Sequence, residues 1–350
     1  MTSTLTQRRW QNFKANRRGY YSLWIFTFLF GLSLFAEFIA NDRPIVISYQ
    51  GHLYFPVLID YTEADLGGEH EMRADFKDPG VRDMISGEGN WQIWPPIPFR
   101  YDTIDYRIET PAPAPPSNRH LVGTDDGAKD TMARLIYGFR LSVLFGLVLT
   151  ALASVIGITV GAVQGFFGGK VDLIGQRLVE IWQGLPILFV LIILASIVEP
   201  NFIWLLLILL LFSWTALVGV VRAEFLRVRN FEFVRAASAM GVSNITIMWR
   251  HVLPNAMVAT LTFLPFILNG SITTLTALDF LGFGLPPGSA SLGELLAQGQ
   301  AQPRGAYVGL TGFVTLAVTL TLLIFIGEAV RDAFDPRKVV QREQRTLGYP

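Results

Sequence analysis

The chain contains no cysteine among its 350 residues and only 4 histidines. Without thiols it has no disulfide, no cysteine nucleophile and no cysteine-ligated metal. Charged residues make up only 16% of the chain, compared with roughly 25% in soluble domains. No segment matches the phosphate-binding pattern G-x-x-x-x-G-K-[ST] or the zinc-binding pattern H-E-x-x-H. We therefore predict a protein that is not an enzyme, with no catalytic residue, no metal site and no cofactor of its own.

Charge is missing above all from three long runs. Residues 141–169, 200–221 and 252–278 are uncharged over 29, 22 and 27 residues. A helix needs about 20 apolar residues to cross the hydrocarbon core of a membrane. The sequence therefore predicts an all-α polytopic membrane protein with six spanning helices at 20–40, 141–167, 179–198, 202–221, 252–277 and 305–328. The first span follows basic residues, as a signal peptide would, but it lacks the small-residue cleavage pattern.

The distribution of lysine and arginine sets the expected orientation, because cytoplasmic loops carry an excess of both. Segments 1–19 and 222–250 hold five such residues each, whereas 199–201 holds none and 278–304 holds one. Both termini are therefore expected in the cytoplasm. The predicted order is a cytoplasmic segment 1–19, the span 20–40, an outer loop 41–135, a membrane core 136–335 that includes the cytoplasmic loop 222–250, and a cytoplasmic tail 336–350.

The outer loop 41–135 is acidic, with 16 Asp and Glu against 9 Lys and Arg. Residues 45–49 and 52–58 read as a β-hairpin around Gln50-Gly51, so we expect a mixed α/β loop. Thr124 is predicted to cap an amphipathic helix that lies on the outer membrane surface and presents Met132, Leu135, Ile136 and Phe139. Two interpretations remain for the loop: a folded cap without a ligand, or a contact site for a soluble delivery partner.

Small residues recur every four positions in the second span, at Ala153, Gly157, Gly161 and Gly165. On a membrane helix such a stripe lets another backbone approach closely, although glycine is also simply common in these helices. The partner helix belongs either to this chain or to another. Pro186, Pro254 and Pro265 are expected to kink their helices.

The cytoplasmic loop 222–250 is the longest connection on its side. Asn230 is predicted to cap a short helix at 231–240, Gly241 to end it with a positive φ, and Ser243 to cap the next helix. Its apolar face would carry Phe233, Ala236, Ala237 and Met240. Such a face fits either a knob for a groove on a cytoplasmic protein or an ordinary connection that lies on the membrane.

This loop resembles the EAA loop of ABC-importer permeases through Ala236-Ala237, Gly241 and Leu253-Pro254 with their spacing. His251 stands at a position that is usually aliphatic, and Arg235 stands where an acid is usual. The resemblance implies that this loop couples the chain to an ATPase. The residues expected to take part are Glu232, Phe233, Arg235, Ala236, Ala237, Met240, Gly241, His251, Leu253 and Pro254.

Two further stretches are similar to dipeptide and oligopeptide permeases of the C type. One runs from His120 to Ser142, before the second span. The other, Leu278 to Gly284, resembles an outer motif of that family, with Asp279 in place of a usual serine. The resemblance makes Asp279, Phe280, Gly282 and Gly284 candidates for an outer gate.

The resemblance implies the type I ABC-importer permease fold in the bacterial inner membrane. The implied partners are a B-type permease in a heterodimer, two ATPase domains or subunits that hold ATP and magnesium, a periplasmic substrate-binding protein, membrane lipid and a peptide substrate; nucleic acid is not expected. Oligopeptides, and peptide antibiotics such as microcin C, would enter by alternating access. The alternatives are a secondary active transporter, an importer of a non-peptide solute such as nickel, and a membrane enzyme.

Overall fold

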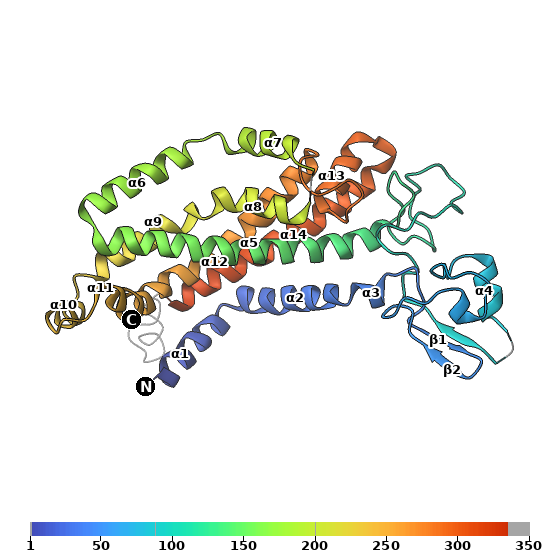
Figure 1. Ribbon diagram of the computed structural model, residues 1–350, viewed down its shortest axis with the longest axis horizontal. Helices are drawn as coiled ribbons and strands as arrows, with labels where there is room; N and C mark the ends of the chain where they lie inside the picture. Colours follow the sequence, from blue (N-terminus) through green and yellow to red (C-terminus); the bar gives the residue numbers. More distant parts are fainter. Residues whose placement is uncertain (1, 88, 200, 335–350) are drawn as a thin grey trace, which may run out of the picture.

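Long helices form an elongated bundle with a small domain at one end (Figure 1). In this computed structural model the described residues are 2–87, 89–199 and 201–334; the predicted tail at 336–350 lies outside them. The long and medium helices are α1 (Thr2–Ala15), α2 (Arg17–Leu34), α5 (Thr131–Phe167), α6 (Gly169–Gln183), α7 (Ile187–Ile197), α8 (Phe202–Ser213), α9 (Thr215–Val228), α12 (Leu253–Phe280), α13 (Leu292–Ala301) and α14 (Ala306–Phe334). The short ones are α3 (Ala36–Ile39), α4 (Pro79–Ile85), α10 (Glu232–Ala239), α11 (Asn244–Thr246), the 3₁₀ turns Ala64–Leu66 and Pro303–Gly305, and a π-helix at Ile247–Val252.

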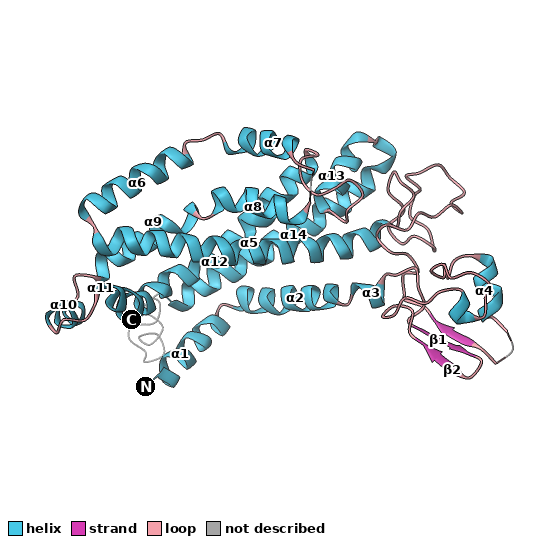
Figure 2. Cartoon of the chain, in the orientation of Figure 1, coloured by secondary structure: helices cyan, strands magenta, loops and turns pink. Residues whose placement is uncertain are grey.

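The strand domain, residues 41–130, holds a three-stranded antiparallel sheet (Figure 2). The central strand β1 (Val46–Tyr49) pairs with β2 (His52–Tyr54) on one side and with β3 (Trp91–Ile93) on the other. The turn at Gln50-Gly51 has positive φ at both residues, as a tight hairpin requires. The predicted hairpin is confirmed, although its second strand ends earlier than expected and β3 was not predicted. The domain core is formed by Ile47, Leu66, Ala74, Phe76, Val81 and Ile85.

Four helical stretches of the described chain are long and apolar enough to cross a membrane: Thr131–Phe167, Phe202–Val228, Asn244–Phe280 and Pro303–Phe334. They contain the second, fourth, fifth and sixth predicted spans. The bent pair of α6 and α7 is a fifth candidate. The first predicted span corresponds to α2 and α3, which are separated at Phe35; α2 contacts α5 and α14.

The third predicted span, 179–198, is not one continuous helix. Its residues belong to α6 and α7, which meet at a bend of 69°. Gly184, Leu185 and Pro186 separate the two helices. Proline has no N–H to donate and its ring clashes with the preceding turn, so the kink expected at Pro186 is a complete break. Figure 1 shows α6 and α7 arching away from the other helices.

The entry into α5 also differs from the prediction. Asp130, not Thr124, caps the helix: its Oδ1 accepts a hydrogen bond of 2.8 Å from the backbone N–H of Ala133. The Thr124 hydroxyl instead accepts a hydrogen bond from the backbone N–H of Ala114. The expected surface helix is the first part of the 37-residue α5. The predicted boundary between loop and core at 135 therefore falls inside a continuous helix.

The small-residue stripe of α5 lies against α9 of the same chain, which answers the question of its partner. A Cβ added at Gly157, Gly161 or Gly165 would lie 2.5–2.7 Å from the carbonyl oxygens of Trp214, Val218 and Arg222 respectively. Ala153, one turn earlier, is buried as well. The two backbones approach so closely that no side chain fits between them, as in other small-residue helix pairs of membrane proteins.

We expect Gly161→Ala to destabilise the bundle, because its Cβ would meet both Val218 O and Val221 Cβ within 2.9 Å, and overpacking costs about 1–3 kcal/mol. The matched control is Gly219→Ala on α9, where nothing lies within 4 Å of the added Cβ. Thermal melting of both purified variants in detergent measures the difference. Equal melting temperatures would contradict the close contact of α5 and α9.

Candidate functional site

The short helix α10 stands at the end of the bundle opposite the strand domain, on the same side as α1 (Figure 1). Phe231 occupies its N-cap position without a side-chain bond. The predicted cap Asn230 instead donates from Nδ2 to the carbonyl of Leu226, so that prediction was wrong. Gly241 follows the helix with φ +80°, and the Ser243 hydroxyl accepts a hydrogen bond from Thr246 N–H. These two predictions are confirmed.

One side of α10 is buried in its own chain. Val234 and Ala237 are 6% and 3% exposed, and they belong to a cluster formed with α5, α9 and the segment before α12. Their neighbours in that cluster include Phe225, Val228, Ile247, Met248 and Val252. The predicted apolar face was therefore wrong at one position, because Ala237 anchors α10 instead of projecting from it. A bulky residue at Ala237 would test the fold of this region before it tested any docking.

The other side of α10 is exposed among the described residues and carries large apolar side chains. Phe233 is 42% exposed and Met240 is 76% exposed, while Phe231 lies beside Phe233 with ring centroids 6.0 Å apart. Ala236, Glu232 and Arg235 are also exposed. We call Phe231, Phe233, Ala236 and Met240 the coupling surface. Exposed apolar groups that protrude on a rigid support are typical of a contact site for another protein.

The loop 222–250, which we call the coupling loop, leads into a long helix. The π-helix Ile247–Val252 continues without interruption into α12. Val252 is fully buried, His251 and Leu253 are half-buried, and Pro254 is exposed. Pro254 is the second residue of α12, directly after the π-helix, and it has no N–H to add to the helical hydrogen bonds at this junction. A turn at Met240–Gly241 and the short helix α11 lie between α10 and this continuous helix.

Two arginines tie the base of this loop to other helices, and the sequence did not point to them. Arg222 on α9 binds Asp172 of α6 through two contacts, one of them Nη2 to Oδ2 at 2.7 Å. Arg229 donates from Nη1 to the carbonyls of Gly165 and Phe166 at the end of α5. A cation there is favoured by the helix dipole. The partners are about 50 or more residues apart in sequence, so only the fold brings them together.

The candidate gate residues lie where α12 ends. Asp279 is buried; its Oδ1 accepts from Leu285 N–H at 2.7 Å and its Oδ2 accepts from the Ser291 hydroxyl at 2.5 Å. Gly284 packs against this carboxylate, and Gly282 has φ +78°. Phe280 is half-buried. The group fixes the turn between α12 and α13; its role as a gate stays a prediction.

The strand domain is joined to the bundle by buried charges. Arg134 on α5 is 1% exposed and binds Asp125, Glu294 and the carbonyl of Ser289, the last two at 2.9 and 2.8 Å. On the other side of α5, Arg140 binds Glu37 with both terminal nitrogens. In the sequence analysis, Arg134 and Arg140 belong to the stretch that resembles C-type permeases, but their ion pairs were not predicted.

A buried histidine lies between two carboxylates nearby. His120 is 3% exposed; its Nδ1 is 2.8 Å from Asp130 and its Nε2 is 3.0 Å from Asp105. An ionised carboxylate only accepts hydrogen bonds, so these two contacts favour a ring that carries a proton on both nitrogens. Burial alone would lower the pKa of His120, but the hydrogen bonds to Asp130 and Asp105 outweigh it and raise the pKa.

The architecture and the loop agree with a known family. The family described as the binding-protein-dependent transport system inner membrane component matches residues 153–340, which is more than half of the chain and includes the whole coupling loop. The chain belongs to this family. Residues 4–56 of the permease also match the N-terminal transmembrane domain of oligopeptide transport permease C.

Curated relatives match nearly the whole permease. The inner membrane ABC transporter permease protein YejE of Escherichia coli is 57% identical over 97% of this chain and 99% of its own. The peptidoglycan transport system permease protein YejE of Agrobacterium fabrum is 56% identical over 96% and 94%. The oligopeptide transport system permease protein OppC of Haemophilus influenzae is 32% identical over 69% and 78%. The permease is thus a multi-pass transport subunit of the inner membrane, and the predicted family and class are confirmed.

Proposed function

We propose that the permease is the membrane subunit of an ATP-binding-cassette importer that moves oligopeptides into the cytoplasm by alternating access. The names of its relatives, which include oligopeptide and peptidoglycan transport permeases, support a peptide substrate. Peptide antibiotics such as microcin C would use the same route. In this proposal the chain spans the membrane six times, with α2–α3 as the first span and α6–α7 as the third.

The observation that carries the proposal is the coupling surface. Phe233 and Met240 project from a helix whose opposite side is anchored by Val234 and Ala237. This helix is too short to be stable alone, so its packing against the bundle fixes the direction in which the apolar groups point. A groove on an ATPase subunit is the partner that fits such a ridge. ATP-driven closure of two ATPases would then move α10, and with it α12.

The proposal also places the remaining partners. The exposed apolar residues of α6 and α7, among them Leu173, Leu178, Ile181 and Phe189, would contact a B-type permease and lipid. A periplasmic substrate-binding protein would dock on the side of the strand domain, opposite α10. Both termini, the coupling surface and the ATPases would be cytoplasmic. ATP and magnesium would be held by the ATPases alone.

The test is the double variant Phe233→Asp/Met240→Asp. We expect it to lose copurification with the ATPase by at least about tenfold, because each central interface anchor contributes roughly 2 kcal/mol, and to lose ATP-dependent peptide uptake in membrane vesicles. Both positions are exposed, so the variant should fold normally.

Met72→Asp is the matched control, since Met72 is 67% exposed but belongs to the strand domain. It should keep both activities. A double variant that retains the ATPase and transports normally would overturn the coupling role of α10. Peptide uptake without any ATPase would instead identify a secondary transporter.

A further inference from the structure

The strand domain contains two adjoining hollows that the transport cycle described above does not use. One has a volume of about 320 Å³ and is lined by charged groups, among them Asp42, Arg73 and Arg100. The other, of about 740 Å³, has a wall of aromatic and proline residues that includes Trp94, Phe99 and Tyr106. The two share four lining residues: Asp42, Asp75, Phe76 and Thr103. We call them together the double hollow.

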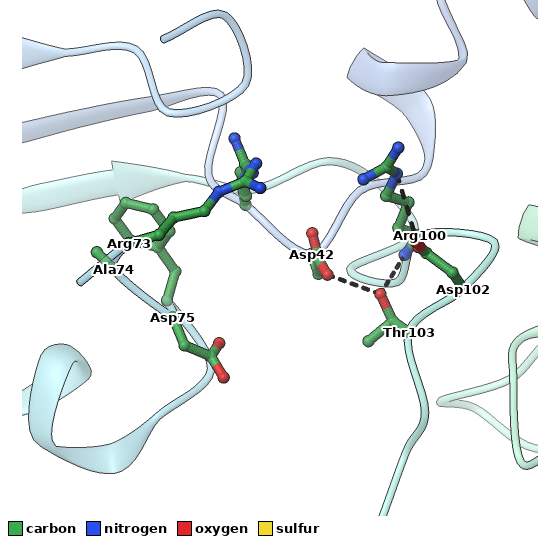
Figure 3. A pocket seen from close by; sticks show the side chains of 9 residues that line it. Asp42, Arg73, Ala74, Asp75, Arg100, Asp102 and Thr103 are labelled. Carbon is green, nitrogen blue, oxygen red and sulfur yellow. Dashed lines mark hydrogen bonds and ion pairs between the residues drawn. The ribbon is translucent and has the colours of Figure 1, made fainter. Parts of the chain in front are cut away.

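The charged half is held in place by hydrogen bonds, as Figure 3 shows. Asp42 Oδ2 accepts from the Thr103 hydroxyl at 2.7 Å, and the same hydroxyl accepts from the backbone N–H of Arg100 at 3.1 Å. Figure 3 shows the side chain of Arg100 on one side of Asp42 and that of Arg73, which pairs with Asp60 at 2.7 Å, on the other. The site is therefore arranged before any ligand arrives, which lowers the entropy cost of binding.

Two cations that line the double hollow lack hydrogen-bond acceptors among the described residues. The guanidinium of Arg100 contacts Asp102 only as an ion pair at 3.6 Å, beyond hydrogen-bond length. The Nζ of Lys77 is shielded and donates no hydrogen bond; it lies 3.8 Å from the centre of the Phe99 ring. Burial lowers the pKa of Lys77 to about 8, against the attraction of Asp42 and Asp105. The Arg100 side chain is 39% exposed and open to a ligand. The Nζ of Lys77 is a desolvated donor without an acceptor, which costs free energy that a carboxylate would relieve.

Arg100 also connects the double hollow with the bundle. It lines a third hollow of about 490 Å³ that is bordered by Tyr137 and Arg140 of α5 and by Phe202 of α8. A ligand held at Arg100 therefore lies where the strand domain meets the candidate membrane spans. The domain as a whole is acidic, so an anion would be retained here by local cations and not by the general field.

We propose that the double hollow binds the carboxylate end of a peptide, with Arg100 as its principal counter-ion and Lys77 in support. The planar fork of arginine matches a carboxylate, and the aromatic and proline wall suits peptide side chains. The proposal rests on peptide import as the function and gives the strand domain a substrate site of its own, beside any site on a binding protein.

The experiment uses the full chain in lipid nanodiscs and three probes: trialanine, trialanine amide and N-acetyl-trialanine. Calorimetric titration should show that the free acid binds roughly tenfold or more tightly than the amide, as expected for one charge-assisted pair. N-acetyl-trialanine, which keeps the carboxylate, should lose less affinity than the amide does. This comparison needs no mutation, so it stands even where a variant folds poorly.

Arg100→Gln should abolish the preference for the acid, and Arg100→Lys should keep part of it. Lys129→Gln is matched in charge and domain but lies outside the lining of both hollows, so it should bind like the unaltered chain. Equal binding of acid and amide, or no binding of either at millimolar concentration, overturns the inference.

ATP-dependent uptake of trialanine by the assembled transporter separates the two proposals. If trialanine is taken up but binds no more tightly than its amide, the proposed site in the strand domain is wrong and peptide import stands. Acid-selective binding that depends on Arg100, without ATP-dependent uptake, would remove import and leave a peptide site.

Discussion

Arg134→Met is expected to release the strand domain from the bundle. The arginine is 1% exposed and holds Asp125, Glu294 and a backbone carbonyl at once. Removing one member of a buried charge network costs about 3–5 kcal/mol, because its partners remain buried without compensation. Hydrogen exchange of amides in residues 41–130 and in the first turns of α5 should accelerate accordingly, since it reports local opening.

A second substitution checks the reason for this loss. Asp125→Asn keeps the Oδ1 acceptor for the N–H groups of Gly127 and Lys129 but removes the carboxylate charge that Arg134→Met leaves buried without a partner. The double variant Arg134→Met/Asp125→Asn should therefore recover part of the lost stability. Arg73→Met is the control for removing an arginine, because the pair of Arg73 with Asp60 in the strand domain is exposed and such pairs contribute roughly 0–1 kcal/mol. Similar rates of amide hydrogen exchange in Arg134→Met and Arg73→Met would contradict the role of Arg134 in holding the strand domain to the bundle.

His120→Gln is expected to weaken the same region by about 3 kcal/mol at neutral pH. A glutamine amide can donate to one of the two carboxylates but carries no charge, and breaking a buried pair has a cost of this order. Asp105 and Asp130 would then face each other without the cation between them. Hydrogen exchange of residues 104–131 measures the change. His70→Gln, at an exposed position in the same domain, should have little effect.

The pH dependence of this site follows from its shifted pKa. The pKa of His120 is raised above its ordinary value of 6.5, so the folded state holds the proton more tightly than the unfolded state. The stabilisation is fully present below about pH 6.5 and is lost as the pH rises through the folded pKa. The strand domain should open more readily under alkaline conditions in the unaltered chain, and this trend should disappear in His120→Gln. A stability that rises with pH above 6.5 would contradict the charged ring.

Local patterns predicted the elements that depend on neighbouring residues. Gln50-Gly51 between alternating strands predicted the hairpin, and Gly241 predicted the end of α10, because turn chemistry resides in one or two residues. Strict four-residue spacing predicted the stripe at Gly157 and Gly161. Periodicity also led to one wrong face, since the pattern of α10 does not reveal that Ala237 is covered by residues before α12.

The missed features depend on distant residues or on competition between neighbours. Thr124 and Asp130 are both good caps; the choice is made by the turn at Asp125–Lys129, in which Ala128 has φ +58°. His120 was noted as one of four scattered histidines and as part of a family resemblance, but not as an ion-pair site, because Asp105 and Asp130 reach it only through the fold. The contact of Arg222 with Asp172 spans 50 residues, and no spacing rule covers such a distance.

The length of α5 has a mechanical consequence. Its 37 residues extend about 55 Å, well beyond a hydrocarbon core of about 30 Å. One end of α5 is held by Arg229, which bonds its last carbonyls, and the other by its own Arg134, which binds Asp125 of the strand domain; the middle packs closely along α9. Such a rod works as a lever arm. A tilt of about 10° around its centre, a modest rotation for an allosteric transition, would shift each end by about 5 Å. A movement of the end of α5 near α10 would therefore also displace the other end, near Arg100 and the double hollow.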